Sequence, residues 1–438
     1  MGMTNNTGIS FVWLRRDLRL DDNAALYHAL RGQQPVLPVF IFDTDILDKL
    51  ENRADARVHF IHQELERLHT ELKQYGSSLL VKIGKPIDVW KQLIIEYPIH
   101  TVFTNHDYEP YAIARDLQIQ QLLKAGNVRF HTYKDHVIFE KNEVLKDDGK
   151  PYTVFTPFSR KWRLKLNSFY SKSYPTLKYA ANFYHTPPFE IPSLQKIGFE
   201  PSLQSFPGRL VKSEIIKQYT EQRDFPAING TSKLGIHLRF GTLSVRKLLA
   251  YAIERNQTFV NELIWRDFYQ QILWHFPYVV KGAFRKEYND IEWSKDEKLF
   301  QSWCQGQTGY PLVDAGMREL NATGYMHNRV RMVVASFLTK HLLLNWQWGE
   351  AYFAEKLLDF DLAANNGGWQ WAAGCGTDAA PYFRVFNPTL QMERFDPELK
   401  YVKHWVPELD TDTYPKPIVD HKEAKDKVMA AYGKALKR

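Results

Sequence analysis

The chain has 438 residues, of which 44% are hydrophobic and 24% are charged, so its length predicts two or three domains of ordinary composition. No run of about 18 apolar residues occurs, so we expect no membrane span, and the first ten residues lack the pattern of a secretory signal. The only cysteines, Cys304 and Cys375, predict neither a disulfide framework nor a cysteine-rich zinc site. We therefore expect a cytoplasmic enzyme with no membrane partner.

The formal net charge of +7 is unevenly distributed along the chain. Residues 1–135 carry 16 Lys and Arg against 17 Asp and Glu, whereas the remaining residues carry 41 against 33. Ten of the 12 tryptophans also follow residue 136. A basic, tryptophan-rich region could bind nucleic acid through its phosphates and bases. A large helical domain that buries many aromatic side chains fits the same composition.

Strand-like and helix-like segments alternate through the first 135 residues. A buried strand at 9–14 precedes a helix at 23–30 that Asn23 caps, and a second strand follows at 35–43. Residues 57–74 have the apolar spacing of an amphipathic helix. Further strands and helices follow in alternation at 78–84, 86–97, 101–105, 114–126 and 128–134. This order predicts an α/β domain with a doubly wound parallel sheet.

The middle of the chain interrupts this pattern. Residues 136–200 are polar, rich in tyrosine and broken by prolines, which predicts a linker. Helical spacing dominates beyond it, and the predicted helices cover 246–255, 259–276, 297–305, 312–323, 326–344 and 350–358. We therefore divide the chain into an α/β domain at 1–135, an interdomain linker at 136–200 and an all-α domain at 201–438.

Two predicted helices gather polar and aromatic residues on one face. The first carries Glu262, Trp265, Arg266 and Tyr269, and the second carries Asn328, Arg331 and Met332. Each face could be a binding site or an ordinary solvated helix surface. The turn after residue 230 offers Thr231 and Ser232 beside glycine, which could bind phosphate or cap a helix.

The segment DFDLAANNGGWQW, residues 359–371, combines carboxylates, amides, glycines and tryptophans. Asp359 and Asp361 are too close in sequence to act as an acid–base pair, but a carboxylate there could pair with Arg331 or accept hydrogen bonds from a ligand. We interpret His327 as structural and predict no metal site. Because no nucleophile has a partnered base, the chemistry would come from a cofactor.

Four long stretches carry the most specific information, and they are FVWLRRDLRLDDNAAL (11–26), NELIWRDFY (261–269), TGYPLVDAGMRELNATGYMHNRVRM (308–332) and DLAANNGGWQWAAGCGTDAAPYFRVFNP (361–388). Together they resemble the photolyase/cryptochrome family of flavoproteins, most closely its bacterial class I cyclobutane pyrimidine dimer branch. The resemblance covers essentially the whole chain. It implies an N-terminal α/β domain, a long linker and an all-helical domain that binds FAD.

Roles for individual residues follow from this resemblance. Residues near the FAD phosphates and ribityl chain would be Tyr219, Thr231, Ser232, Lys233, Leu234 and Gly235. Lys233 stands where many relatives have arginine, and Gly235 where many have serine. Residues around the flavin and adenine would be Phe259, Glu262, Arg266, Asn328, Arg331, Asp359, Asp361 and Asn365. The electron chain to the flavin would be Trp369, Trp346 and Trp293.

The resemblance also implies a substrate, a pyrimidine dimer flipped out of ultraviolet-damaged DNA. Trp265 and Trp371 would form an aromatic wall against the dimer, and Met332 would fill the gap beside it. Glu262 and Asn328 would hydrogen-bond the bases, with Glu262 stabilising the dimer radical anion. Basic side chains would make the other contacts with DNA. Arg266 would lie near the dimer, and the backbone phosphates would be bound by Arg223, Arg329 and Arg384.

The choice among family activities rests on a few positions. Asn365 would face flavin N5, where plant-type photoreceptors carry an aspartate that can donate a proton, so the amide favours the fully reduced flavin used in repair. The (6-4) photolyases typically have paired histidines near the MHN site, where this chain has Asn328. We therefore predict light-driven repair of cyclobutane dimers by a monomeric photolyase, a carbon–carbon lyase.

Two other readings stay open at this point. A blue-light photoreceptor without repair activity would be expected to carry a long C-terminal tail, whereas this chain ends about 50 residues after NPTLQMERF. A flavin-binding nucleic-acid module would bind the lesion without turnover in light. A second antenna chromophore is expected in the family, but its identity is open, because folate-binding relatives carry an acid where Ala112 stands.

Overall fold

The computed structural model describes residues 8–379 and 381–436, and the secretory-signal prediction therefore falls mostly outside the described residues. Contacts between residues divide the chain into two compact units, and each consists of separate segments. The first unit comprises the chain up to Glu140 with Leu166–Arg209 and Leu234–Tyr251. The second comprises Lys141–Lys165, Leu210–Lys233 and the chain from Ala252 onward. The predicted domain boundaries at residues 135 and 200 stay a prediction.

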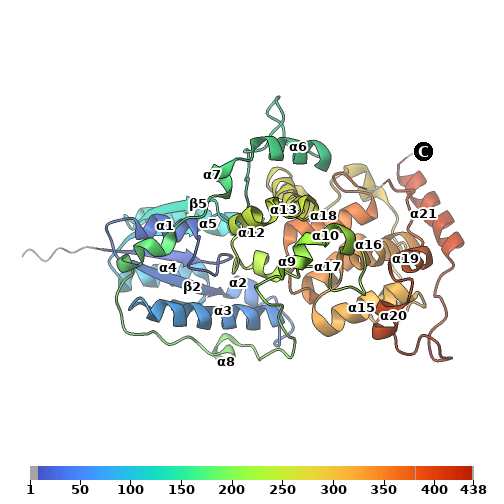
Figure 1. The fold of residues 1–438 in the computed structure, drawn as a ribbon, viewed down its shortest axis with the longest axis horizontal. Helices are drawn as coiled ribbons and strands as arrows, with labels where there is room; N and C mark the ends of the chain where they lie inside the picture. Colours follow the sequence, from blue (N-terminus) through green and yellow to red (C-terminus); the bar gives the residue numbers. More distant parts are fainter. Residues whose placement is uncertain (1–7, 380, 437–438) are drawn as a thin grey trace, which may run out of the picture. The chain divides into compact units, whose positions relative to one another are not determined.

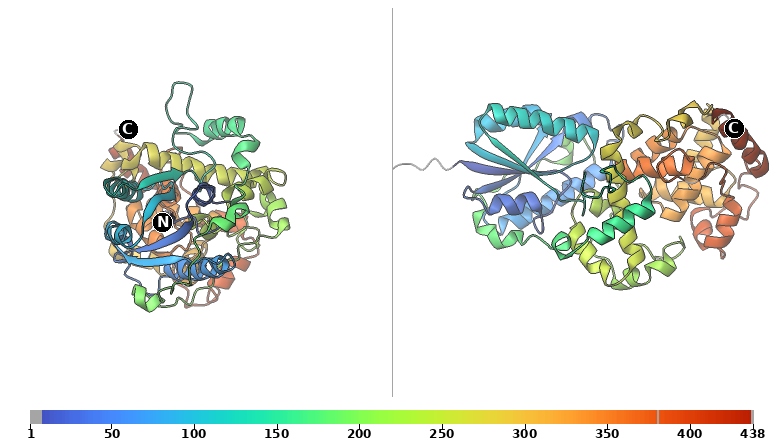
Figure 2. Two further views of the ribbon diagram at one scale, coloured as in Figure 1. Left: turned by 90° about the vertical axis from the view of Figure 1, so that its left-hand side faces the viewer. Right: turned by 90° about the horizontal axis from the view of Figure 1, so that it is seen from above.

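The first unit is built on a parallel sheet, which has five strands among the described residues, in the order β3-β2-β1-β4-β5. The strands are β1 (Ile9–Leu14), β2 (Val36–Asp43), β3 (Leu80–Gly84), β4 (Ile99–Asn105) and β5 (Arg129–Tyr133). The helices between them are α1 (Ala24–Leu30), α2 (Thr44–Leu47), α3 (Ala56–Lys73), α4 (Pro86–Glu96) and α5 (Pro110–Ala125). Figure 2 shows helices on both faces of the sheet, as a doubly wound fold requires. The predicted α/β fold is confirmed.

Local sequence explains the agreement in this unit. The side chain of Asn23 caps α1 by accepting a hydrogen bond from the Leu26 amide, as its position before an apolar run predicts. Alternate residues of the central strands, such as Phe11, Trp13 and Val102, pack against Trp90 and Leu93 of α4. Since βαβ crossovers are right-handed, the reversal of strand order at β4 places α4 and α5 on the face opposite α1 and α3.

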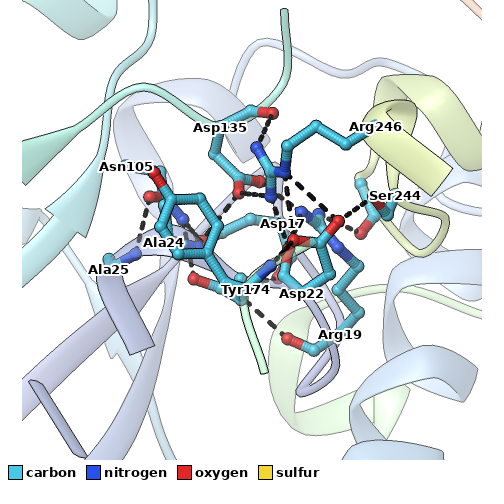
Figure 3. Close-up of polar contacts among 12 residues, drawn as sticks. Asp17, Arg19, Asp22, Ala24, Ala25, Asn105, Asp135, Tyr174, Ser244 and Arg246 are labelled. Atoms are coloured by element: carbon cyan, nitrogen blue, oxygen red, sulfur yellow. Dashed lines mark hydrogen bonds and ion pairs between the residues drawn. The ribbon is translucent and has the colours of Figure 1, made fainter. Parts of the chain in front are cut away.

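Later segments of the chain complete this unit. They are α7 (Ser168–Ser171), η1 (Thr176–Asn182), α8 (Leu194–Ile197), α11 (Gly235–Arg239) and most of α12 (Val245–Ile253). A buried network of charges holds α12 to the turn after β1 (Figure 3). The guanidinium of Arg246 donates to the carboxylates of Asp22 at 3.0 Å and Asp135 at 2.8 Å. Arg19 donates to the other oxygen of Asp135 at 2.7 Å. Part of the stretch at 11–26 that resembles the family therefore stabilises the fold of this unit.

The network makes a prediction about acid stability. Burial alone would raise the pKa of Asp135, but the charges of Arg19 and Arg246 outweigh it and lower the pKa from 3.8 to about 2. A carboxyl whose pKa is lower in the folded state stabilises the fold above pH 4, and that contribution is lost as the pH falls toward 2. The shift corresponds to about 2 kcal/mol. We expect the difference in unfolding free energy between wild type and Asp135→Asn, measured with urea, to shrink by that amount between pH 5 and pH 2, and a constant difference would contradict the assignment.

The second unit is helical (Figure 1). Its longest helix, α13 (Gln257–His275), is capped by Asn256. The others that concern the site are α6 (Phe155–Lys165), α10 (Tyr219–Gln222), α16 (Asn328–Ser336), α17 (Trp346–Lys356) and α18 (Leu362–Ala373). The rest among the described residues are α9 (Ser213–Lys217), η2 (Pro277–Val280), η3 (Lys286–Asp290), α14 (Glu297–Cys304), α15 (Pro311–Thr323), η4 (Phe337–His341), α19 (Pro388–Phe395), α20 (Lys400–Trp405) and α21 (His421–Ala435). None of the helices within residues 8–379 and 381–436 is long and apolar enough to cross a membrane. The predicted all-α fold of the C-terminal region is confirmed.

Three details differ from the sequence prediction. The predicted linker contains α6, an 11-residue helix, because Phe158 and Trp162, four residues apart, give it a buried side. The helix predicted at 326–344 ends at Ser336 and continues as a short π-helical turn, Phe337–His341. The segment after Asp361 forms α18 despite its adjacent glycines, since Asp361 caps the helix and tertiary packing outweighs the low helix propensity of glycine.

Candidate functional site

The site is built around one face of α13, where helical spacing brings polar and aromatic side chains together as predicted. Glu262 lies on this face and forms an ion pair with Arg223, which follows α10. Burial raises the pKa of Glu262, and the charge of Arg223 opposes that effect. Glu262 can therefore hold a proton for a hydrogen bond more easily than an exposed glutamate. Because Arg223 is paired with Glu262, it can bind a DNA phosphate as predicted only if it contacts the carboxylate and the phosphate together.

An ion pair joins α16 to the segment before α18. Arg331 Nη2 lies 3.0 Å from Asp359 Oδ2, and Arg331 Nε donates to the carbonyl of Met326 at 2.7 Å. The other carboxylate oxygen of Asp359 is buried and has no hydrogen-bond partner among the described residues. A buried acceptor is costly when nothing donates to it, so Oδ1 is suited to receive a hydrogen bond from a ligand.

His327, beside this pair, has a structural role. Its side chain caps α16 by accepting a hydrogen bond from the Arg329 amide at 3.2 Å. Burial first, and the charge of Arg331 second, lower the pKa of His327 to about 4. A neutral ring is required for this cap, because the ring nitrogen must accept.

The amides of α18 are fixed by groups that sequence reasoning missed. Asn365 Nδ2 donates to the carbonyl of Glu350 at 3.0 Å, and Asn366 Nδ2 donates to the Glu350 carboxyl at 2.9 Å. Burial raises the pKa of Glu350 to about 7. Asp361 caps α18 and accepts from Gln270 of α13 at 2.9 Å. Gln270 lies four residues after Arg266 and could have been predicted from helical spacing, whereas no sequence signal marks Glu350.

The residues predicted to lie near the FAD phosphates belong to three different parts of the chain. Tyr219 begins α10, and its ring meets that of Phe259 edge-on at 5.1 Å. Thr231 shares a hydrogen bond of 3.1 Å with the Tyr325 hydroxyl, and the ammonium of Lys233 lies over the Tyr325 ring at 5.1 Å. Ser232 lies between these two residues. Leu234 and Gly235, at the start of α11, are grouped with the first unit.

The residues that surround α18 fit a flavin. The buried acceptor of Asp359 has a guanidinium beside it, which suits a polar ring that carries both donors and acceptors. A Cβ added at Gly368 would meet nothing within 4 Å, so the helix has open space there. A Cβ at Gly367 would instead lie 2.2 Å from the ring of Tyr269, which explains the need for glycine where α18 packs on α13.

The tryptophans predicted to form the lesion wall and the electron chain differ in how exposed they are. Trp265 is half-buried, and Trp371 is half-buried with its ring 6.4 Å from that of Phe386. Trp369 and Trp346 are 2% and 4% exposed, and Trp293 is half-buried with its ring 6.0 Å from that of Tyr432. Trp303, which the sequence did not single out, lies 6.0 Å from Trp369 between ring centroids.

Two of the three candidate phosphate contacts, Arg329 and Arg384, line a hollow in the second unit, and Arg223 does not. Its walls are Asp224, Arg329, Arg384, Phe386, Gln391, Arg394 and Phe395. Arg329 donates to Asp224 at 2.8 Å, lies over the ring of Phe395, and approaches the sulfur of Met332 at 3.9 Å. Arg384 is exposed, and its guanidinium lies over the ring of Phe386, 5.5 Å from the centroid. Arg394 is a further basic residue here that sequence reasoning missed.

A polar cluster also lies at the carboxyl edge of the sheet in the first unit, where the strand order reverses between β1 and β4. Arg15 follows β1 and pairs with Asp116 at 2.5 Å, and Arg16 pairs with Asp107 at 3.2 Å. Ligands of doubly wound folds bind at this edge.

Two family models match the sequence. One, described as DNA photolyase, matches residues 10–178, and the other, described as the FAD binding domain of DNA photolyase, matches residues 259–411. A deoxyribodipyrimidine photo-lyase from Halobacterium salinarum is 37% identical, with coverage of 97% of this chain and 98% of the relative. The enzyme of the same name from Escherichia coli is 36% identical, with coverage of 97% and 98%.

Solved structures agree with the sequence comparisons. A bacterial class III photolyase from Agrobacterium tumefaciens has a TM-score of 0.91 and 33% identity, and all of both chains is covered. An archaeal photolyase from Sulfolobus tokodaii, described with two FAD molecules, has a TM-score of 0.83 and 34% identity over 97% of this chain and 99% of that one. A Synechocystis cryptochrome has a TM-score of 0.81 and 26% identity over 97% and 99%.

The parallel sheet, the helical unit and the matches over nearly the whole length indicate one family. The chain belongs to the photolyase/cryptochrome family. Within it, the curated relatives reported above are deoxyribodipyrimidine photo-lyases. The finer assignment to class I stays a prediction, since a class III structure is also similar over the full chain.

Proposed function

We propose that this protein is a deoxyribodipyrimidine photolyase that uses FAD and light to split cyclobutane pyrimidine dimers in ultraviolet-damaged DNA. The observation that carries the proposal is that one helical unit holds the paired Glu262, the Arg331–Asp359 ion pair and the anchored amide of Asn365. Full-length similarity to enzymes of that name supports it. We expect the protein to act as a cytoplasmic monomer.

FAD, when it is bound fully reduced, would supply one electron to the dimer in light and take it back after the ring opens. The residues of this chain hold and tune that exchange. Arg331 would place positive charge beside the ring, and Asp359 Oδ1 would accept a hydrogen bond from it. Asn365, whose amide is held by the Glu350 carbonyl, would present an oxygen that cannot donate a proton.

The lesion would be held by the remaining residues. Trp265 and Trp371 would stack against the extruded bases, and Glu262 and Asn328 would hydrogen-bond their edges. The arginines that line the hollow of the second unit would bind backbone phosphates, which predicts an affinity that falls with salt. A second chromophore would bind at the carboxyl edge of the sheet in the first unit.

Glu262 gives the most direct test of the catalytic proposal. Glu262→Ala removes the group that would stabilise negative charge on the dimer, and we expect the repair quantum yield to fall about two- to tenfold, the effect of one hydrogen bond. Glu262→Gln keeps a donor and should retain more activity. The measurement is dimer splitting by reduced, FAD-loaded protein under blue light with saturating oligonucleotide. An undiminished yield in Glu262→Ala would show that this role is wrong.

The same assay separates the enzyme from its alternatives. A photoreceptor without repair activity would leave the dimer intact and show no preference for damaged DNA. A flavin-binding nucleic-acid module would bind the damaged oligonucleotide and leave it intact after illumination. Light-dependent loss of the dimer by wild type, with catalytic turnover, is the result that the proposal requires.

A further inference from the structure

One face of the Trp265 indole is covered by the ring of Phe155. The two ring centroids lie 3.6 Å apart, and the ring planes differ by only 2°. Aromatic pairs ordinarily prefer offset or edge-on arrangements at larger separations, so a face-to-face contact this close must be imposed by the surrounding structure. Both side chains are half-buried rather than enclosed in the core.

The helix that carries Phe155 is fastened along α13, beside which it lies (Figure 1). Trp162 of α6 donates its indole hydrogen to Asp267 of α13 at 2.9 Å, and both residues are at most 1% exposed. Nearer the end of α6, Arg163 donates to the side chain of Asn261 at 2.8 Å. Helix α6 therefore cannot slide on α13 without breaking a buried hydrogen bond, which costs more than an exposed one.

The start of α6 is held from a second direction by the segment after α18. The backbone amide of Phe155 donates to the carboxylate of Asp378 at 3.0 Å. The hydroxyl of Thr377 donates to the carbonyl of Thr153 at 2.5 Å. Phe158, one turn further, packs its ring 5.2 Å from that of Phe268. The backbone of Phe155 is thus fixed between α13 and this segment.

We propose that Phe155 is a positioning residue that holds the Trp265 indole in one plane, so that the flipped pyrimidine dimer stacks on the opposite indole face. This inference rests on the proposed function, in which Trp265 is part of the lesion wall. The ring of Tyr269 also lies near the indole, but it is offset, with 5.5 Å between ring centroids and 28° between the ring planes. Because Phe155 covers one face at 3.6 Å, the stacked base would take the opposite face. A ring that is immobilised in advance loses less conformational freedom when the base arrives, which strengthens binding without a new contact to DNA.

The test replaces the ring while keeping apolar volume. Phe155→Leu should weaken binding of a single-stranded oligonucleotide with one thymine dimer by about three- to tenfold, the cost of ordering one side chain on binding. Its affinity for the undamaged oligonucleotide should not change. In repair assays the half-saturating concentration should rise while the rate at saturation stays the same. Phe155→Tyr keeps the stacked ring and should bind the dimer as wild type does.

A matched control is Phe169→Leu, because Phe169 is a phenylalanine that is 75% exposed on the other compact unit. It should leave dimer binding unchanged. The proposal is wrong if Phe155→Leu binds the dimer as tightly as wild type. It is also wrong if Phe155→Leu binds the dimer more tightly, since Phe155 would then occupy the place of the base. If wild type itself does not prefer the damaged oligonucleotide, the proposed function fails instead.

Fluorine NMR of protein labelled with 5-fluorotryptophan reads the stack without DNA or light. The Trp265 signal is assigned by its absence in Trp265→Phe. In wild type the Phe155 ring current should displace this signal, and Phe155→Leu should move it toward the position of exposed tryptophan and broaden it. An unmoved Trp265 signal would mean that the two rings are not stacked in solution and would overturn the proposal.

Discussion

Arg246→Met is expected to destabilise the first compact unit by about 3–5 kcal/mol, the cost of removing one partner from a buried ion pair. Arg246 is 5% exposed, and its two carboxylate partners, Asp22 and Asp135, are fully buried. Methionine fills a similar volume but provides no charge and no donor. Asp22 would lose the guanidinium that holds its carboxylate and carbonyl, at a position where its backbone φ is +49°.

The measurement is thermal unfolding followed by circular dichroism, with urea unfolding for the free energy. A loss of this size should lower the melting temperature of a unit of roughly 200 residues by about 10 °C. The neighbouring residue provides a matched control, because Lys247 pairs with Asp21 at the surface, with side chains 47% and 52% exposed. Lys247→Met should cost less than about 1 kcal/mol. Equal effects from the two variants would contradict the special role of the buried network.

A second substitution should recover part of the loss. In Arg246→Met the buried carboxylate of Asp22 loses its ion-pair partner, whereas Asp135 keeps Arg19, so the double variant with Asp22→Asn removes the charge that is left unpaired. We expect it to be more stable than Arg246→Met by itself. Non-additivity of this kind is what residues in one network show, whereas independent sites would add their losses.

The α/β unit was predictable because its signals are local. Strand spacing, an amphipathic pattern at 57–74 and the cap at Asn23 are each encoded within a few residues, and each reappears in the structure. The charge network was not predictable in this way. Arg246 lies more than 220 positions from Asp22, and only the fold brings them together. Sequence spacing gives no measure of that proximity.

The candidate site was predictable to a different degree at each residue. Helical spacing alone put Glu262, Trp265 and Arg266 on one face, and the Arg331–Asp359 pair was named from charge and confirmed as a contact. Family resemblance supplied the roles of the tryptophans, which composition could not. Neither residue spacing nor family resemblance singled out Glu350 or Phe155. Glu350 accepts hydrogen bonds from Asn365 and Asn366 of another helix, which helical spacing cannot predict, and Phe155 lies in a segment whose prolines suggested a linker.

Trp369→Phe is expected to abolish photoreduction of the oxidised flavin while repair by chemically reduced protein survives. Trp369 lies one turn after Asn365 on α18 and is almost fully buried. A Cβ added at Gly349 of α17 would lie 2.1 Å from its ring, so the two helices meet there. Trp346 precedes Gly349 by three residues and shares that face of α17. Exposure then increases toward Trp293, which suits a route that carries an electron inward from the surface.

Trp303→Phe separates this route from its nearest competitor. The Trp303 ring lies 6.0 Å from that of Trp369, closely enough to accept the same role, but its indole hydrogen is bonded to the carbonyl of Val334 and the side chain is fully buried. If electrons pass through Trp346 and Trp293, Trp303→Phe should photoreduce nearly as fast as wild type, whereas Trp346→Phe should not. The absorbance of FAD-loaded protein under blue light without oxygen follows the reaction. Loss of photoreduction in Trp303→Phe with activity retained in Trp346→Phe would place the electron route through Trp303, and normal photoreduction in Trp369→Phe would remove Trp369 from any route.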